Sequence, residues 1–189
     1  MKYNFAIMGA GSIAQRMGET VQKTDIVNGY AVASRDLSRA QNLADKYGFC
    51  KAYGSYDEML ADPAVDLVYI ATPHVFHASQ IEQCLRAGKH VLCEKSFTIN
   101  ADQARRVTAL AQEKGLLLAE AIWPRYMPMA KTLREFAASD KIGKIHSLTA
   151  NLGYPVYHRE RLHDRSLGGG ALLEYMEGKE LPGVAAIRK

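Results

Sequence analysis

Three small residues near the start of the chain are spaced to hold the phosphates of a dinucleotide. Gly9, Gly11 and Ala14 form a G-x-G-x-x-A pattern directly after the apolar run at residues 5–8. A strand that turns sharply into a helix needs glycine where a Cβ would clash, and a second glycine lets the backbone approach a pyrophosphate. The helix expected after Gly11 would direct unpaired N–H groups at the phosphates. The pattern predicts a dinucleotide-binding turn, with an ordinary tight turn as the alternative.

A second group of polar residues, Ser34, Arg35 and Arg39, suits the 2′-phosphate of NADP. It follows a second strand-like run at residues 30–33, where a dinucleotide-binding fold contacts the adenosine ribose. An enzyme that uses NAD usually has an acidic residue there, whereas two guanidiniums and a hydroxyl suit a dianionic phosphate. We therefore predict that NADP is preferred, with NAD possible. Asp36 is interpreted as the N-cap of the following helix rather than as a ribose ligand.

Strand-like and helix-like segments alternate over the first 122 residues. Strands are expected at residues 5–8, 30–33, 51–53, 65–73, 89–95 and 116–122, and helices from residue 12 and at 35–48, 56–63, 76–87 and 100–115. This alternation predicts an α/β fold, a doubly wound parallel sheet. The carboxyl ends of its strands meet at one edge, where ligands bind. The unusual polar residues fall at those ends, so this edge is the predicted site.

Composition limits the possible functions of this 189-residue chain. Its length allows one substantial core and a second, smaller unit. The net charge of +4 comes from scattered basic residues, so nucleic acid is not an expected partner. Cys50, Cys84 and Cys93 are an odd number without a C-x-x-C pair, which favours reduced thiols in the cytoplasm. No apolar run reaches the length of a membrane span, so no membrane partner is expected.

Five motifs taken together resemble the Gfo/Idh/MocA family of glucose–fructose oxidoreductases and inositol dehydrogenases. They are IMGAGSIA, IATPHVFH, HVLCEKSFTIN, EAIWPRYMP and LGGGALLE, in this order, over residues 3 to 174. The last two look most like the dihydrodiol and xylose-type dehydrogenases. The resemblance implies an N-terminal Rossmann domain, residues 1–122, and part of an α/β substrate domain, residues 123–189. It also implies an NAD(P)-dependent dehydrogenase of small sugars, polyols or diols that forms homo-oligomers.

The resemblance implies a catalytic role for Lys95 in the motif Glu94-Lys95-Ser96, where Ser96 replaces the proline of the family. Lys95 would stabilise the alkoxide of the substrate as hydride leaves. His74 and His77 lack a third ligand at suitable spacing, so no metal is predicted. The cofactor-binding residues expected from the patterns and the resemblance are Gly9, Ala10, Gly11, Ser12, Ile13, Ala14, Ser34, Arg35, Arg39, Ala71, Thr72, Pro73, His74, His77, Glu94, Lys95, Trp123 and Arg125.

The sequence departs from the family after Glu174, where the expected proton donor position falls on Gly178. Three hypotheses therefore stand: an NADP-dependent oxidoreductase, a truncated remnant that binds the nucleotide without turnover, and a redox-sensing or interaction module. Residues 144–154 are expected to form a strand of an incomplete sheet, whose exposed apolar face would favour self-association. A kinase or ATPase is not favoured because no Gly-Lys-Ser/Thr follows the glycine turn. A methyltransferase is a weaker rival, since its glycine turn usually follows an acidic residue.

Overall fold

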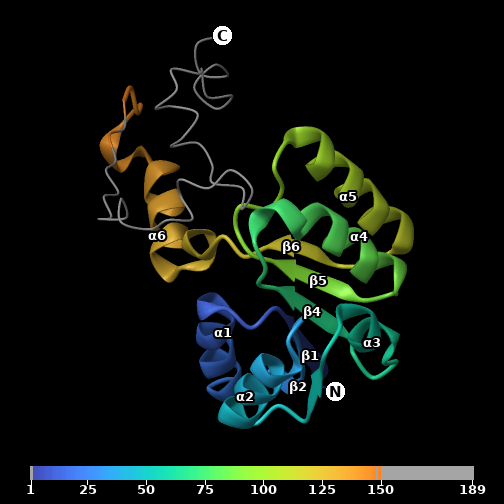
Figure 1. Cartoon of the computed structure of the whole chain (residues 1–189). Coiled ribbons are helices and arrows are strands. Elements are labelled where there is room, and N and C mark those ends of the chain that lie inside the picture. The colour runs from blue at the N-terminus through green and yellow to red at the C-terminus, as the bar shows by residue number, and fades with distance from the viewer. Residues whose placement is uncertain (1, 148, 150–189) are drawn as a thin grey trace, which may run out of the picture. The chain divides into compact units, whose positions relative to one another are not determined.

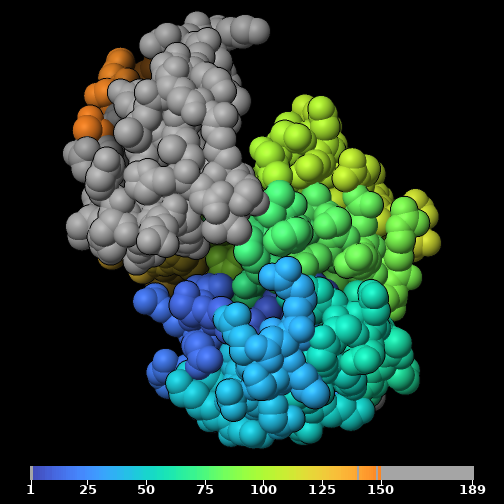
Figure 2. All heavy atoms as spheres, in the orientation of Figure 1, coloured from blue at the N-terminus to red at the C-terminus, as the bar shows by residue number. Residues whose placement is uncertain are grey.

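The structure is a computed structural model that describes residues 2–147 and 149 of the chain. The chain divides after Ala121 into two compact units, Met1–Ala121 and Ile122–Lys189, and each is described by itself. The atoms of the first unit form one continuous body in the space-filling view (Figure 2). This first unit holds all six strands that the sequence predicts.

The first unit is built on six parallel strands (Figure 1). Their bounds are β1 Tyr3–Met8, β2 Val27–Ala33, β3 Lys51–Tyr53, β4 Leu67–Ile70, β5 His90–Cys93 and β6 Leu118–Glu120. They lie in the order β3-β2-β1-β4-β5-β6, and every neighbouring pair is parallel. The order reverses direction between β1 and β4, which is the topological switch point of a doubly wound sheet. The predicted Rossmann-type α/β fold is confirmed.

Helices cover both faces of this sheet because the buried strands are apolar on both sides. The helices of the first unit are α1 Ser12–Gln22, α2 Leu37–Tyr47, α3 Tyr56–Ala61, η1 His74–Phe76, α4 His77–Arg86 and α5 Ala101–Lys114. In β1, Phe5 and Ile7 pack in one core cluster with residues of α1 and α2. Ala6 and Met8 belong to the other cluster, with residues of α3, α4 and α5. The alternation of side chains along β1 thus divides the core into two layers.

Local signals in the sequence set the ends of several helices. The Asp36 side chain accepts from the N–H of Ser38 at 2.9 Å and so caps α2, as predicted. Asn100 caps α5 in the same way, by accepting from the N–H of Gln103. Gly48 ends α2 in the left-handed conformation, which costs a glycine little. These caps satisfy backbone groups that the helices themselves leave without partners.

The described part of the second unit is helical. It contains η2 Trp123–Tyr126, α6 Pro128–Ala137 and η3 Asp140–Ile142. Pro128 stands at the first position of α6, where its missing N–H costs nothing. The strand expected at residues 144–154 lies largely outside the described residues, and those that are described, 144–147 and 149, are not in a strand.

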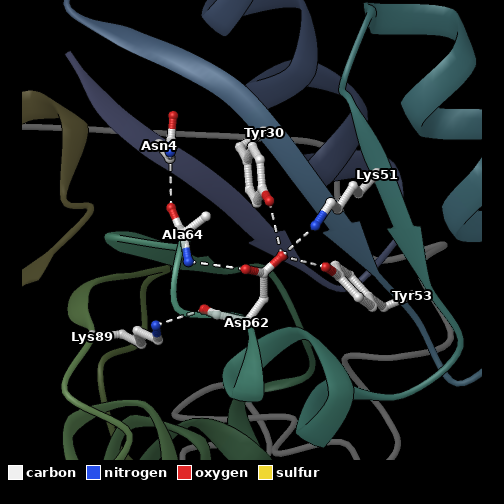
Figure 3. Close-up of polar contacts among 7 residues, drawn as sticks. All are labelled: Asn4, Tyr30, Lys51, Tyr53, Asp62, Ala64 and Lys89. Atoms are coloured by element: carbon white, nitrogen blue, oxygen red, sulfur yellow. Dashed lines mark hydrogen bonds and ion pairs between the residues drawn. The ribbon is translucent and has the colours of Figure 1, made fainter.

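A half-buried carboxylate joins β2, β3 and the turn after α3 (Figure 3). Asp62 Oδ2 accepts from the Lys51 ammonium at 2.8 Å and from the Tyr30 and Tyr53 hydroxyls at 2.9 and 2.5 Å. Tyr30 is the residue skipped in the pairing of β2 with β1, and this bulge allows it to face the same side of the sheet as Tyr53. The Lys51 ammonium, together with the hydroxyls, holds the pKa of Asp62 well below its usual range.

We expect Asp62→Asn to lower the free energy of unfolding by about 2 kcal/mol at about pH 7, because charge-assisted hydrogen bonds are lost. The pKa of Asp62 in the folded state lies below its usual value of 3.8. The stabilisation is therefore present above about pH 4 and is lost as the pH falls further, so the difference between variant and parent shrinks in acid. Denaturant titrations at about pH 7 and about pH 3 measure this.

Asp102→Asn is the matched control for this prediction. Asp102 pairs with Arg105 on the surface of α5, and its side chain is 91% exposed. An exposed pair of this kind contributes little, so the control should change the free energy of unfolding by less than about 0.5 kcal/mol. If Asp62→Asn lowered the free energy of unfolding by the same amount at both pH values, the role of the carboxylate charge would be contradicted.

Candidate functional site

The ends of five strands are level with one another along one edge of the sheet. In the pairing register Met8 lies opposite both Ala33 and Ile70, and Cys93 lies opposite both Ile70 and Glu120. The residue after each of three strands extends this register by one hydrogen bond: Gly9 N–H to Ala33 O at 2.8 Å, Ala71 N–H to Met8 O at 2.9 Å and Glu94 N–H to Ile70 O at 3.0 Å. The sheet thus places the predicted strand-end segments of this unit side by side.

The glycine turn lies at the switch point between β1 and β4. Gly9 has a φ of +109°, and a Cβ on it would lie 3.0 Å from the carbonyl oxygen of Ala71 and 3.3 Å from Thr72 Cγ2. Gly11 is the N-cap of α1, and no side chain caps the N–H groups of this helix. A Cβ on Gly11 would have no atom within 4 Å. The turn therefore leaves open space in front of unpaired N–H groups, as a pyrophosphate requires.

The other residues of the turn occupy the positions that the pattern predicts. Ala14 is fully buried in α1, where it packs in the core cluster that contains Ile7. Ser12 and Ile13 form the exposed first turn of α1, and Ala10 is half-buried. The small residue at the third position of the pattern thus lets α1 approach β1 closely.

The two glycines allow separate tests of stability and binding. Gly9→Ala should lower the free energy of unfolding by about 1–3 kcal/mol, because alanine is strained at this φ and crowds the backbone of Ala71. Gly11→Ala should cost less than about 1 kcal/mol, because its backbone is extended and its surroundings are open. We expect Gly11→Ala instead to weaken dinucleotide binding by about 10-fold, as its methyl group occupies the approach to the N–H groups. Denaturant and cofactor titrations decide this, and unchanged affinity in Gly11→Ala would contradict the placement of the pyrophosphate.

The polar group after β2 gathers at the same edge. Ser34 is buried, and its Oγ accepts from the N–H of Asp36 at 3.3 Å, so its hydroxyl hydrogen can still be donated. Arg35 and Arg39 are exposed, and the Arg39 guanidinium donates to Ala10 O in the glycine turn at 3.3 Å. Burial raises the pKa of Tyr56, and the charges of both arginines oppose this rise, so both lie within electrostatic reach of the phenol.

Side chains of α4 hold the segment after β4. Thr72 Oγ1 donates to Gln80 Oε1 at 2.5 Å, and His77 Nε2 lies 2.9 Å from the carbonyl oxygen of Thr72. His77 is fully buried, and its ring makes an edge contact with His74 at 5.4 Å between centroids. Of the residues expected here to contact a cofactor, His77 is engaged inside the fold, whereas Thr72, Pro73 and His74 are half-buried or exposed.

The turn after β5 presents Lys95. The Lys95–Ser96 peptide is cis. Glu94 precedes it and accepts from the buried Tyr69 hydroxyl at 2.5 Å, while Phe97 N–H donates to Glu120 Oε1 at 3.0 Å. Burial and the Glu94 carboxylate raise the pKa of Tyr69, so the phenol remains a donor. Lys95 itself is exposed, and no carboxylate among residues 2–147 and 149 forms an ion pair with its ammonium.

Sequence reasoning missed two supports of this edge, Tyr69 and Gln80. Tyr69 lies within an apolar run, and only its hydroxyl distinguishes it from a core residue. Gln80 is a polar residue on the buried side of α4, a signal that helical spacing could have exposed. Glu120 ends β6, and its contact with Phe97 was not foreseen.

Two predicted cofactor residues belong to the second unit. Trp123 and Arg125 lie in η2, and both are exposed. Gly178, the expected donor position, lies outside the described residues. In the described part of the chain, no group of three or more His, Cys, Asp or Glu side chains is arranged to hold a metal, and no helix is long and apolar enough to cross a membrane.

The comparison with known families decides the identity of the fold. Residues 3–121 match the model of the Gfo/Idh/MocA family, described as an oxidoreductase family with an NAD-binding Rossmann fold. The chain belongs to the Gfo/Idh/MocA family. This match covers the first unit, with the glycine turn, the arginine pair and the Lys95 turn, and confirms the resemblance seen in the motifs.

Characterised relatives in the Gfo/Idh/MocA family place the chain near one branch. It is 44% identical over 144 residues to trans-1,2-dihydrobenzene-1,2-diol dehydrogenase of Homo sapiens and 40% identical to that of Xenopus laevis. The human alignment covers 76% of this chain and 43% of the relative. The chain thus spans less than half the length of the curated relatives that it matches.

Solved structures of family members hold both nicotinamide cofactors. A 3-ketoreductase from Actinomadura kijaniata in complex with NADP is 33% identical, with a TM-score of 0.69 over 72% of this chain and 44% of that one. GenD2 from gentamicin A biosynthesis, in complex with NAD, is 30% identical, with a TM-score of 0.69 over 73% of this chain and 39% of that one. The fold is therefore one that binds NAD(P), and these relatives do not decide between the two cofactors.

Proposed function

We propose that this chain is an NADP-dependent dehydrogenase that oxidises a CH–OH group of a sugar, polyol or diol. The observation that carries the proposal is the alignment of strand ends, which brings the glycine turn, the Arg35 and Arg39 pair and the Lys95 turn to one edge. The relative named trans-1,2-dihydrobenzene-1,2-diol dehydrogenase and the structural neighbour named a 3-ketoreductase support the substrate class. The activity itself is a proposal for this chain.

The arrangement supports NADP over NAD. The cofactor pyrophosphate would lie in front of α1, where Gly11 leaves open space and the first N–H groups lack a side-chain cap. The adenosine 2′-phosphate would then meet the guanidiniums of Arg35 and Arg39 and the hydroxyl of Ser34, a set of donors without a carboxylate. Asp36, the nearest acid in the sequence, is occupied as the cap of α2. The segment after β2 therefore supplies no acidic group that is free to accept from the ribose hydroxyls.

Lys95 is the residue that we assign to catalysis. Its turn is fixed on both sides, by Tyr69 through Glu94 and by Glu120 through Phe97. The Lys95 ammonium would donate a hydrogen bond to the substrate oxygen and stabilise it as the hydroxyl proton passes to water at this exposed edge. A bound nicotinamide supplies the hydride acceptor. We also propose that Trp123 and Arg125 lie near the nicotinamide end of the cofactor. This proposal rests on the motif EAIWPRYMP.

The alternative of a redox-sensing module has less support. Burial raises the pKa of the Cys84 thiol to about 12 and also raises that of Cys93. Thiol–disulfide chemistry needs an accessible thiolate, so these two cysteines do not suit it.

We also propose a cytoplasmic location and a homo-oligomeric state for the protein. The three cysteines are free in the structure, which supports the cytoplasmic location. Sedimentation velocity can test the oligomeric state.

A paired experiment on one purified sample tests the proposed function. Fluorescence titration measures the Kd values of NADPH and NADH, and absorbance measures the reduction of NADP with sugars, polyols and trans-dihydrodiols. Tight NADPH binding with substrate-dependent reduction is the expected result. Binding without turnover on any of these classes would overturn the dehydrogenase assignment for this chain and support the remnant hypothesis. Absence of binding to either nucleotide would overturn the proposal altogether.

A further inference from the structure

His77 contacts two loops at once from the start of α4. Its Nδ1 lies 2.8 Å from the carbonyl oxygen of Ser96, and its Nε2 lies 2.9 Å from the carbonyl oxygen of Thr72. Both distances are those of good hydrogen bonds. The ring is fully buried, so water does not compete for either nitrogen. The histidine therefore bridges the segment after β4 and the turn that carries Lys95.

The chemistry of the two partners fixes the number of protons on this ring. A carbonyl oxygen accepts hydrogen bonds and cannot donate them. A neutral imidazole has one N–H and one lone pair, so one of the two contacts would set a lone pair against a carbonyl oxygen. Only an imidazolium can donate from both nitrogens. Charge-assisted hydrogen bonds are also about twice as strong as neutral ones, which offsets part of the cost of burying the charge.

We propose that His77 is an imidazolium that donates to Thr72 O and Ser96 O and thereby fixes the spacing of the Thr72 segment and the Lys95 turn. It is a positioning residue, because its buried ring contacts the backbone of Ser96, the residue after the exposed Lys95. The protonation state stands on the geometry alone. The consequence for cofactor binding rests on the proposed function, since both loops are part of the proposed NADP site.

The titratable residues on the segments that contact His77 are His74, whose ring touches that of His77, and Glu94 and Lys95 on the turn after β5. Each bridged loop has a further tether. Gln80 holds the side chain of Thr72, and Glu120 holds the N–H of Phe97, next to Ser96. With these tethers in place, His77 supplies the contact that joins the two loops to each other through one rigid helix.

Nitrogen-15 NMR of the histidine rings at about pH 7 tests the protonation state in the unaltered protein. We expect both ring nitrogens of His77 to carry protons. His90 is the internal reference, because its Nδ1 accepts from the N–H of Leu117 at 3.0 Å and must therefore be unprotonated. A single N–H on the His77 ring would overturn the proposal. This measurement requires neither cofactor nor substitution.

His77→Gln tests the positioning role, because the glutamine amide has one nitrogen and cannot reach both carbonyls. We expect the Kd of NADPH to rise by about 10-fold or more, while the matched variant His90→Gln changes it by less than about 2-fold. Equal Kd values for His77→Gln and the parent would overturn the positioning role. If the parent binds no nucleotide, the proposed function fails and the NMR result still decides the protonation state. If His77→Gln does not fold, His77→Asn replaces it, and an unchanged Kd of NADPH for that variant would likewise overturn the positioning role.

Discussion

Lys95→Ala is expected to lower the kcat of substrate-dependent NADP reduction by about 10²–10³-fold, the range lost when one donor to a developing oxyanion is removed. The Kd of NADPH should change by less than about 3-fold, because the glycine turn and the arginine pair supply most of the binding. This separation arises because Lys95 is exposed at the strand end and no ion pair among the described residues occupies its ammonium. Steady-state absorbance assays measure kcat, and fluorescence titration measures the Kd of NADPH.

Lys114→Ala is the control for this prediction. Lys114 is the last residue of α5, directly before the left-handed Gly115 and at the end of the sheet opposite Lys95. Its removal takes away one positive charge without touching the proposed site, so kcat should not change. A Lys95→Ala protein that retains kcat within about 3-fold of the parent would show that the chemistry depends on another residue.

The second large effect concerns the choice between cofactors. We expect the double variant Arg35→Ala/Arg39→Ala to weaken NADPH binding by about 10²–10⁴-fold, since each charge-assisted hydrogen bond contributes about 1.5–3 kcal/mol. Arg35→Ala alone should reduce the binding free energy of NADPH by about 1.5–3 kcal/mol and should leave NADH binding unchanged. Arg39→Ala should weaken NADH slightly as well, because Arg39 also donates to Ala10 O in the glycine turn.

Fluorescence titrations of NADPH and NADH with each variant measure these effects. Arg86→Ala is the control for a general loss of positive charge, because Arg86 is exposed at the end of α4, away from the strand ends. If the titrations are repeated at higher salt, the difference between the Kd values of NADPH and NADH should become smaller, because salt screens the exposed charges of the arginines. Equal affinities of the unaltered protein for the two cofactors would refute the NADP preference.

Much of the fold was predictable because each of its features has a local cause. The alternation of apolar runs with helical spacing predicted six strands, and the structure has them in parallel order. Asp36 was recognised as a helix cap because an Asp before a helix has a short-range partner, the N–H of Ser38. The start of β2 was less well predicted, since the strand begins at Val27 and contains a bulge at Tyr30. A bulge depends on the neighbouring strand, which the local sequence does not contain.

The sequence by itself determined which residues have suitable chemistry: the glycines of the turn, the arginine pair and Lys95. Only the tertiary structure decided how these residues are held, because their supports come from segments far apart along the chain. Glu94 is bound by Tyr69, Phe97 by Glu120, and Ser96 by His77, over separations of 19 to 25 residues. Such contacts follow from strand register and helix packing, which bring distant residues within hydrogen-bond distance. The sequence identified His77 as a cofactor residue, and the structure shows that its buried ring lies between two backbone carbonyl oxygens and so joins two loops.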